Sequence, residues 1–285
     1  KHFKIDLRCL LYDTTNFATC IDSFNDASTL AQRGKSKQKR SDLRLIGLAL
    51  LVTRDFHIPL FHHVYAGNVH DAPTFASVTD QLLERYRLFA RHVDGITLVY
   101  DKGNNSLDNQ GAVDATPYHF VGSVSPAQHP DLLAVPRDRF HALAGADLAG
   151  TCAYRTRKAV LGADRTLVVT FNPELFLTQS ETILREVRKA THRLHDLQRA
   201  LSAPARGAGR TRTAVEKDIH DILHARHLKD LVRVTLLDAP TLALTYEVDQ
   251  VAWTHLQETL LGKNVLFTDQ DGWSDEEIVR TYRSQ

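Results

Sequence analysis

The sequence predicts an α/β fold, with a mixed sheet that is flanked by helices and interrupted by a mixed α+β insertion. The first observation behind this prediction is an apolar run that ends on Asp13 and then turns polar. The second is a similar run, residues 96–100, that leads into Asp101. The third is the stretch 75–90 between them, in which apolar residues recur at helical spacing. Strands that alternate with helices are typical of sheets covered by helices.

The composition is that of a globular protein. The 285 residues are 43% hydrophobic and 24% charged, which is enough for a large core and for two domains. No apolar run reaches the roughly 18 residues that a membrane span needs. Three cysteines without metal-ligand spacing indicate a reducing compartment, so we expect a cytoplasmic protein with no membrane partner. The chain starts at Lys1 and contains no Met, so we expect a fragment of a longer protein.

Three strands are expected near the start of the chain. Residues 7–20 form a strand that is rich in apolar and β-branched side chains and crosses Asp13 midway. Residues 22–42 have no apolar periodicity and are expected to form a long loop. The apolar runs at 43–53 and 57–65 are separated by a short polar turn, so they predict an antiparallel hairpin.

A helix and two more strands follow the hairpin. The helix runs to about residue 90, and the strand that ends on Asp101 comes next. A short helix at 106–114 and a strand at 118–124 complete this region. A strand after a crossover helix tends to return parallel to its sheet, which places Asp101 beside Asp13. This order of elements predicts a ribonuclease H-like core.

The chain is expected to divide into the first part of this core at 1–125, an insertion at 126–249 and the end of the core at 250–285. Prolines and glycines punctuate the start of the insertion. Its expected elements are two strands, two helices and a hairpin, at 152–160, 166–171, 173–201, 215–228 and 231–246. The last segment contains a helix, a short strand at 265–268 and a final helix that is capped by Ser274.

The two aspartates have the chemistry of a metal site. An ionised carboxylate at the edge of a core needs a partner or a metal to offset the lost solvation. Two strands that each deliver one carboxylate at the same end of a sheet provide the hard oxygen ligands that Mg²⁺ prefers. Asp13 and Asp101 are therefore the candidate catalytic and metal-binding residues. The alternative is that each aspartate only ends its strand as a turn former.

Basic residues gather in one short segment. They are Arg33, Lys35, Lys37, Lys39 and Arg40. Such a segment is either a solvated loop or a surface that contacts phosphate groups. Lys102 and Asn104, which follow Asp101, are expected to contact phosphate as well, with a plain turn around Gly103 as the alternative.

Several short motifs resemble, in their order and spacing, those of the DDE transposases of bacterial insertion sequences, in the IS-four-like superfamily. The motifs are Tyr12–Phe17, Arg33–Lys37, Gly67–Asp71, Tyr100–Asn104 and the closing run Leu266–Arg283. The resemblance spans almost the whole chain.

The resemblance implies a ribonuclease H-like core that binds two Mg²⁺ or Mn²⁺ ions, nicks the ends of a transposon and joins the freed 3′-hydroxyl to target DNA. It maps the first catalytic aspartate onto Asp13 and the second onto Asp101. It also implies DNA as the partner of the basic residues, a homodimer in the synaptic complex, and a location in the bacterial cytosol and nucleoid. The basic face of the helix at 173–201 is then either a further DNA contact or a solvated surface.

The third catalytic residue of that family is a glutamate on the final helix. It would fall about one helical turn beyond Gln285, so we expect this chain to be inactive or badly impaired by itself. The alternative function is a catalytically silent, nucleic-acid-binding relic of a transposase. A generic metal phosphohydrolase would need a further carboxylate or more histidine ligands near Asp13, and neither is evident.

Overall fold

The computed structural model describes residues 5–22, 24, 25, 27–34, 42–69, 75, 81, 95–203, 210–238 and 242–285. The chain forms two compact units. Unit 1 comprises residues 1–128, 137–170 and 264–285, and unit 2 comprises residues 129–136 and 171–263.

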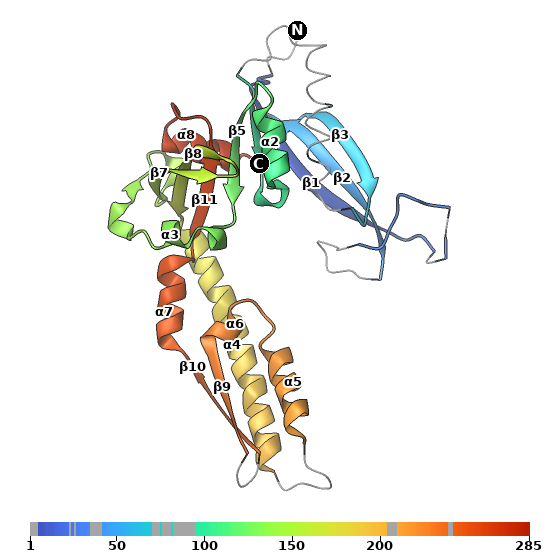
Figure 1. Cartoon of the computed structure of the whole chain (residues 1–285), viewed down its shortest axis with the longest axis vertical. Helices are drawn as coiled ribbons and strands as arrows, with labels where there is room; N and C mark the ends of the chain where they lie inside the picture. The colour runs from blue at the N-terminus through green and yellow to red at the C-terminus, as the bar shows by residue number, and fades with distance from the viewer. Residues whose placement is uncertain are drawn as a thin grey trace. The chain divides into compact units, whose positions relative to one another are not determined.

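Unit 1 is built on a mixed sheet in the order β3-β2-β1-β4-β5-β11-β8-β7-β6 (Figure 1). The strands are β1 (Cys9–Thr19), β2 (Arg44–Thr53), β3 (Pro59–Ala66), β4 (Thr97–Tyr100), β5 (His119–Val124), β6 (His141–Ala142), β7 (Cys152–Val160), β8 (Ala163–Phe171) and β11 (Lys263–Thr268). Helix α2 (Leu107–Asp114) connects β4 to β5, and helix α8 (Asp275–Arg283) follows β11.

The first five strands confirm the predicted ribonuclease H-like α/β fold. The strands β1, β2 and β3 pair as an antiparallel meander. Strand β4 then pairs in parallel with β1, and β5 pairs in parallel with β4. Almost all of the helix predicted between β3 and β4 lies outside the described residues. Phe75, a described residue of that stretch, is buried.

Burial explains the pairing pattern of these strands. In β2 every second residue is buried, as in a strand with one face on the core. In β4 all four residues are buried, which is typical of a central parallel strand that is covered on both faces. Tyr100 lies in an aromatic cluster, with its ring centroid 4.9 Å from that of Phe75 and 6.2 Å from that of Phe267. The aspartate that follows Tyr100 therefore starts from a rigid position.

The division into units differs from the predicted segments. Strands β7 and β8 were expected in an insertion at 126–249, but they extend the sheet of unit 1 beyond β11. The reason is the burial of β8, where the six residues 165–170 are all buried. The apolar residues among them, Leu167, Val168 and Val169, need cover on both faces of the sheet. Strand β11 was expected at 265–268 and pairs antiparallel with β5.

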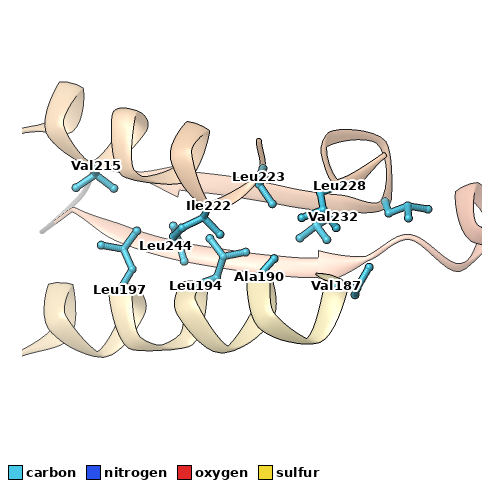
Figure 2. Close-up of a cluster of buried hydrophobic side chains, with 11 residues drawn as sticks. Val187, Ala190, Leu194, Leu197, Val215, Ile222, Leu223, Leu228, Val232 and Leu244 are labelled. Atoms are coloured by element: carbon cyan, nitrogen blue, oxygen red, sulfur yellow. The ribbon is translucent and has the colours of Figure 1, made fainter. Parts of the chain in front are cut away.

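Unit 2 contains the helices α3 (Pro130–Leu133), α4 (Pro173–Ser202), α5 (Arg212–Ile222), α6 (Leu228–Leu231) and α7 (Gln250–Thr259), with the hairpin of β9 (Val232–Leu237) and β10 (Ala243–Val248). Its core is a cluster of aliphatic side chains from α4, α5, α6 and the hairpin (Figure 2). None of the helices in the described part of the chain is long and apolar enough to cross a membrane.

Helix α4 is the main element of unit 2. Asn172 caps it by accepting hydrogen bonds from the amides of Glu174 and Leu175. Its buried residues recur at intervals of three and four, which puts Val187, Leu194 and their neighbours on one face. Its basic residues are exposed and are Arg185, Arg188, Lys189, Arg193 and Arg199.

The helix predicted at 215–228 is two helices in the structure. Helix α5 ends at Ile222, and α6 begins at Leu228. His227, which precedes α6, has a φ of 68°. This left-handed conformation is incompatible with a continuous right-handed helix.

Candidate active site

Asp13 and Asp101 occupy equivalent positions on neighbouring strands. Tyr12 of β1 and Tyr100 of β4 are paired in the parallel register, and each aspartate is the next residue along its chain. Because the two strands run in the same direction, both aspartates leave the paired region at the same end of β4. The structure therefore brings together the two carboxylate residues that the sequence analysis selected.

The side chain of Asp101 is held by two hydroxyl groups. Ser123 on β5 donates a hydrogen bond from its Oγ to Asp101 Oδ1 over 2.9 Å. The phenol of Tyr282 on α8 lies 3.0 Å from the same oxygen and 2.8 Å from Ser123 Oγ. Two elements from distant parts of the sequence thus meet at one carboxylate oxygen.

The side chain of Asp13 has fewer hydrogen-bond partners than that of Asp101. It lies within β1, is exposed, and accepts a hydrogen bond on Oδ1 from the backbone amide of Thr14 over 2.7 Å. In the described part of the chain, neither Asp13 nor Asp101 forms an ion pair. A divalent cation is a partner that carboxylates on two neighbouring strands could share.

The donor set fits a divalent metal ion with few protein ligands. Asp13 and Asp101 supply hard carboxylate oxygens, and Mg²⁺ usually keeps several water molecules in addition to one or two carboxylates. Among the described residues there is no group of three or more histidine, cysteine, aspartate or glutamate side chains that could hold a metal ion. The fit therefore rests on these two aspartates.

The loop after Asp101 is ordered by amide side chains. A 3-10 turn at Lys102–Asn104 leads to Ser106, which caps α2 by accepting a hydrogen bond from the amide of Asn109. Asn109 Nδ2 donates to the backbone oxygen of Asn104 over 2.7 Å. Lys102 is exposed, whereas Asn104 is only 3% exposed. Asn104 was expected at a phosphate, but its side chain lies in the protein interior.

The basic segment can be placed only at its start. Arg33 is described and exposed, just after the bridge between Gln32 and Leu45. The other members, Lys35, Lys37, Lys39 and Arg40, lie outside the described residues.

A chain of polar contacts holds Tyr100, the last residue of β4. The phenol of Tyr100 donates to Gln110 Oε1 over 2.6 Å, and Gln110 Nε2 donates to Asp114 Oδ1 over 2.9 Å. Asp114 Oδ2 accepts from Arg165 Nη2 over 2.6 Å. Burial holds the pKa of Tyr100 well above its usual value, so its phenol stays a neutral donor. The contacts tie α2 and β8 to the strand that leads into Asp101.

Sequence reasoning missed Ser123, Tyr282 and Arg165. A signal existed for Ser123, because it is the one hydroxyl residue in the apolar run of β5 and buried polar groups need partners. Tyr282 belongs to the closing motif of the resemblance, but nothing in the sequence assigns it a contact with Asp101.

Burial raises the pKa of Tyr282 to about 12, and the nearby Asp101 carboxylate adds to this effect. Folding therefore favours the neutral phenol. The resulting stabilisation is complete below the ordinary pKa of about 10 and is lost as the pH rises through about 12. We expect the tyrosinate absorbance of the wild type minus that of Tyr282→Phe to rise near pH 12. A difference curve centred near pH 10 would show that Tyr282 is solvated and does not contact Asp101.

No protein-family model and no curated protein matches the chain. Among solved structures, the chain is similar to that of a piggyBac transposase in a cryo-EM structure of its synaptic complex with hairpin DNA, at 14% sequence identity and a TM-score of 0.33. The match covers 57% of this chain and 30% of the transposase chain. A likeness of this size does not decide a function, so the proposal below depends on the geometry of the site.

Proposed function

We propose that this chain is the catalytic region of a DDE-type DNA transposase, an enzyme that cleaves DNA strands and transfers them with the help of divalent metal ions. The observation that carries the proposal is the pairing of Tyr12 with Tyr100, which sets Asp13 and Asp101 side by side without a basic partner among the described residues. The resemblance of the sequence motifs to insertion-sequence transposases supplies the reaction class.

Asp13 and Asp101 would hold Mg²⁺ or Mn²⁺. When bound, such ions activate the attacking oxygen and stabilise the leaving oxygen of a phosphodiester. The contribution of the protein would be to place the two carboxylates. The parallel register of β1 and β4 supports this role, because Asp13 lies within β1 and Asp101 directly follows β4. Lys102 is exposed directly after Asp101, where its ammonium group would attract a DNA phosphate.

The proposal extends to the partners. DNA is the substrate, and Arg33 and the other basic residues of its segment would contact the phosphates. By the same resemblance we propose a homodimer in the complex with transposon ends, and a cytosolic location.

A second candidate is a nucleic-acid-binding protein without catalytic activity. It is favoured by the finding that the described residues contain no group of three or more metal-ligating side chains. Such a protein would bind DNA through its basic residues and would not need Asp13 or Asp101.

The test is a Mn²⁺ titration of the whole chain, followed by the electron paramagnetic resonance signal of free Mn²⁺. We expect Asp13→Asn and Asp101→Asn each to weaken Mn²⁺ binding about tenfold or more, because each removes one charged ligand. Asn keeps the size of the side chain and therefore the fold.

The control variant is Asp138→Asn, which removes an exposed carboxylate from unit 1 outside the site. Its Mn²⁺ affinity should match that of the wild type. Equal affinities in all four proteins would overturn the metal site and, if duplex DNA still binds, would favour the second candidate.

A further inference from the structure

We propose that Ser123 and Tyr282 are positioning residues that saturate Oδ1 of Asp101 and leave Oδ2 as the single oxygen that faces a metal ion. The inference rests on the proposed function and assigns a role to two residues that lie outside the predicted site. Both act through Asp101 and do not touch the ion.

The hydrogen-bond geometry leads to this inference. The oxygens of Ser123 and Tyr282 lie 2.9 Å and 3.0 Å from Asp101 Oδ1, and 2.8 Å from each other. Among the described residues, no hydrogen bond to Oδ2 is found. The carboxylate is thus satisfied on one oxygen and open on the other.

The protons can be assigned from the donors present. Ser123 Oγ accepts a hydrogen bond from the backbone amide of Lys102 over 3.2 Å, so its own hydrogen can point at Asp101. The hydrogen of Tyr282 points at Asp101 Oδ1 or is shared with Ser123 Oγ. Ser123 therefore donates to the carboxylate, and Tyr282 supports the same oxygen either directly or through Ser123. Hydrogen bonds to an ionised group are about twice as strong as neutral ones.

The two hydroxyls are themselves held in place. Ser123 is 5% exposed, and its backbone oxygen accepts a hydrogen bond from Asn105 Nδ2 over 2.5 Å. Tyr282 packs against the buried side chains of two core clusters of unit 1. Side chains that are already restrained in this way lose little further conformational entropy when an ion binds.

The consequence is a fixed mode of metal binding. A carboxylate with two free oxygens can rotate between one-oxygen and two-oxygen coordination of an ion. Asp101 is held against this rotation, so it should act as a one-oxygen ligand with a preset direction. Hydrogen-bond partners of metal ligands commonly change metal affinity about 10- to 100-fold when they are removed.

The experiment is a double-mutant cycle on Mn²⁺ affinity in the whole chain. We expect Ser123→Ala and Tyr282→Phe each to weaken Mn²⁺ binding about tenfold, and Ser123→Thr, which keeps the hydroxyl, to restore most of the affinity. In the Asp101→Asn background, the same two substitutions should have no further effect, since they act only through the carboxylate. Tyr282→Phe keeps the ring and its packing, so it reports on the hydroxyl even where Ser123→Ala disturbs β5.

The controls remove hydroxyls of the same kind from unit 1, by Ser125→Ala and Tyr154→Phe, and should leave Mn²⁺ affinity unchanged. The inference is overturned if Asp101→Asn weakens binding while Ser123→Ala and Tyr282→Phe bind Mn²⁺ like the wild type. It is also overturned if the hydroxyl variants weaken binding equally with and without Asp101. If Asp101→Asn itself has no effect, the proposed function fails first.

Discussion

Arg165→Met is expected to lower the free energy of unfolding of unit 1 by about 3 kcal/mol. Arg165 is 5% exposed, and its Nε donates to the backbone oxygen of Val160 over 3.0 Å. Its guanidinium carbon also lies 4.9 Å from the ring centroid of Phe120, a cation–π distance. Asp114, its ion-pair partner, has a side chain that is 38% exposed, so water compensates part of the loss and the figure stays at the lower end for a broken buried pair.

This variant also bears on the site. Arg165 ends the chain of contacts that passes through Asp114 and Gln110 to Tyr100, the residue before Asp101. Met fills a similar volume but leaves the carboxylate of Asp114 without its cation. We therefore expect β4 to loosen together with the core.

Urea denaturation measures the effect, because each unit contains one of the two tryptophans, Trp273 in unit 1 and Trp253 in unit 2. In a Trp253→Phe background, the fluorescence of Trp273 reports unit 1 alone. The control is Arg157→Met, whose side chain is 51% exposed and pairs with Asp164 and Asp271. Exposed ion pairs contribute little to the free energy of unfolding, so an equal loss in both variants would contradict the role given to Arg165.

Leu194→Ala is expected to destabilise unit 2 by about 2–5 kcal/mol. Leu194 is fully buried, at 0% exposure, in the middle of the buried face of α4. It points into the cluster that contains Leu244 of the hairpin and Ile222 of α5 (Figure 2). Truncation to Ala removes apolar contacts on both sides and leaves a cavity.

The fluorescence of Trp253 in a Trp273→Phe background follows this unfolding transition. The matched control is Leu184→Ala on the same helix, where the side chain is 42% exposed and the change removes little buried area. The free energy of unfolding of the control should lie within about 1 kcal/mol of that of the wild type. A loss for Leu194→Ala no larger than that of the control would mean that α4 is not held by the cluster in Figure 2.

Much of the core of unit 1 could be predicted from the sequence because its signals are local. The run before Asp13 and the run before Asp101 are each strand-like over a few residues, and the hairpin at 43–65 is marked by a short polar turn. A strand that follows a crossover helix tends to return parallel to its sheet, and this tendency predicted that β4 lies next to β1. The helix at 215–228 was predicted too long, because apolar spacing does not report the backbone conformation of a residue such as His227.

Local patterns were enough to predict the hairpin at 43–65, the parallel return of β4 and the choice of Asp13 and Asp101 as candidates, because periods of two and of 3.6 residues act over one element at a time. The position of β7 and β8 in the sheet depends on long-range packing, since any apolar strand can pair with several edges. The same holds for the contacts of Asp101, whose partner Tyr282 is 181 residues away. Such a contact depends on how α8 packs on the sheet, and the packing of one element against another is a property of the whole fold that no local pattern encodes.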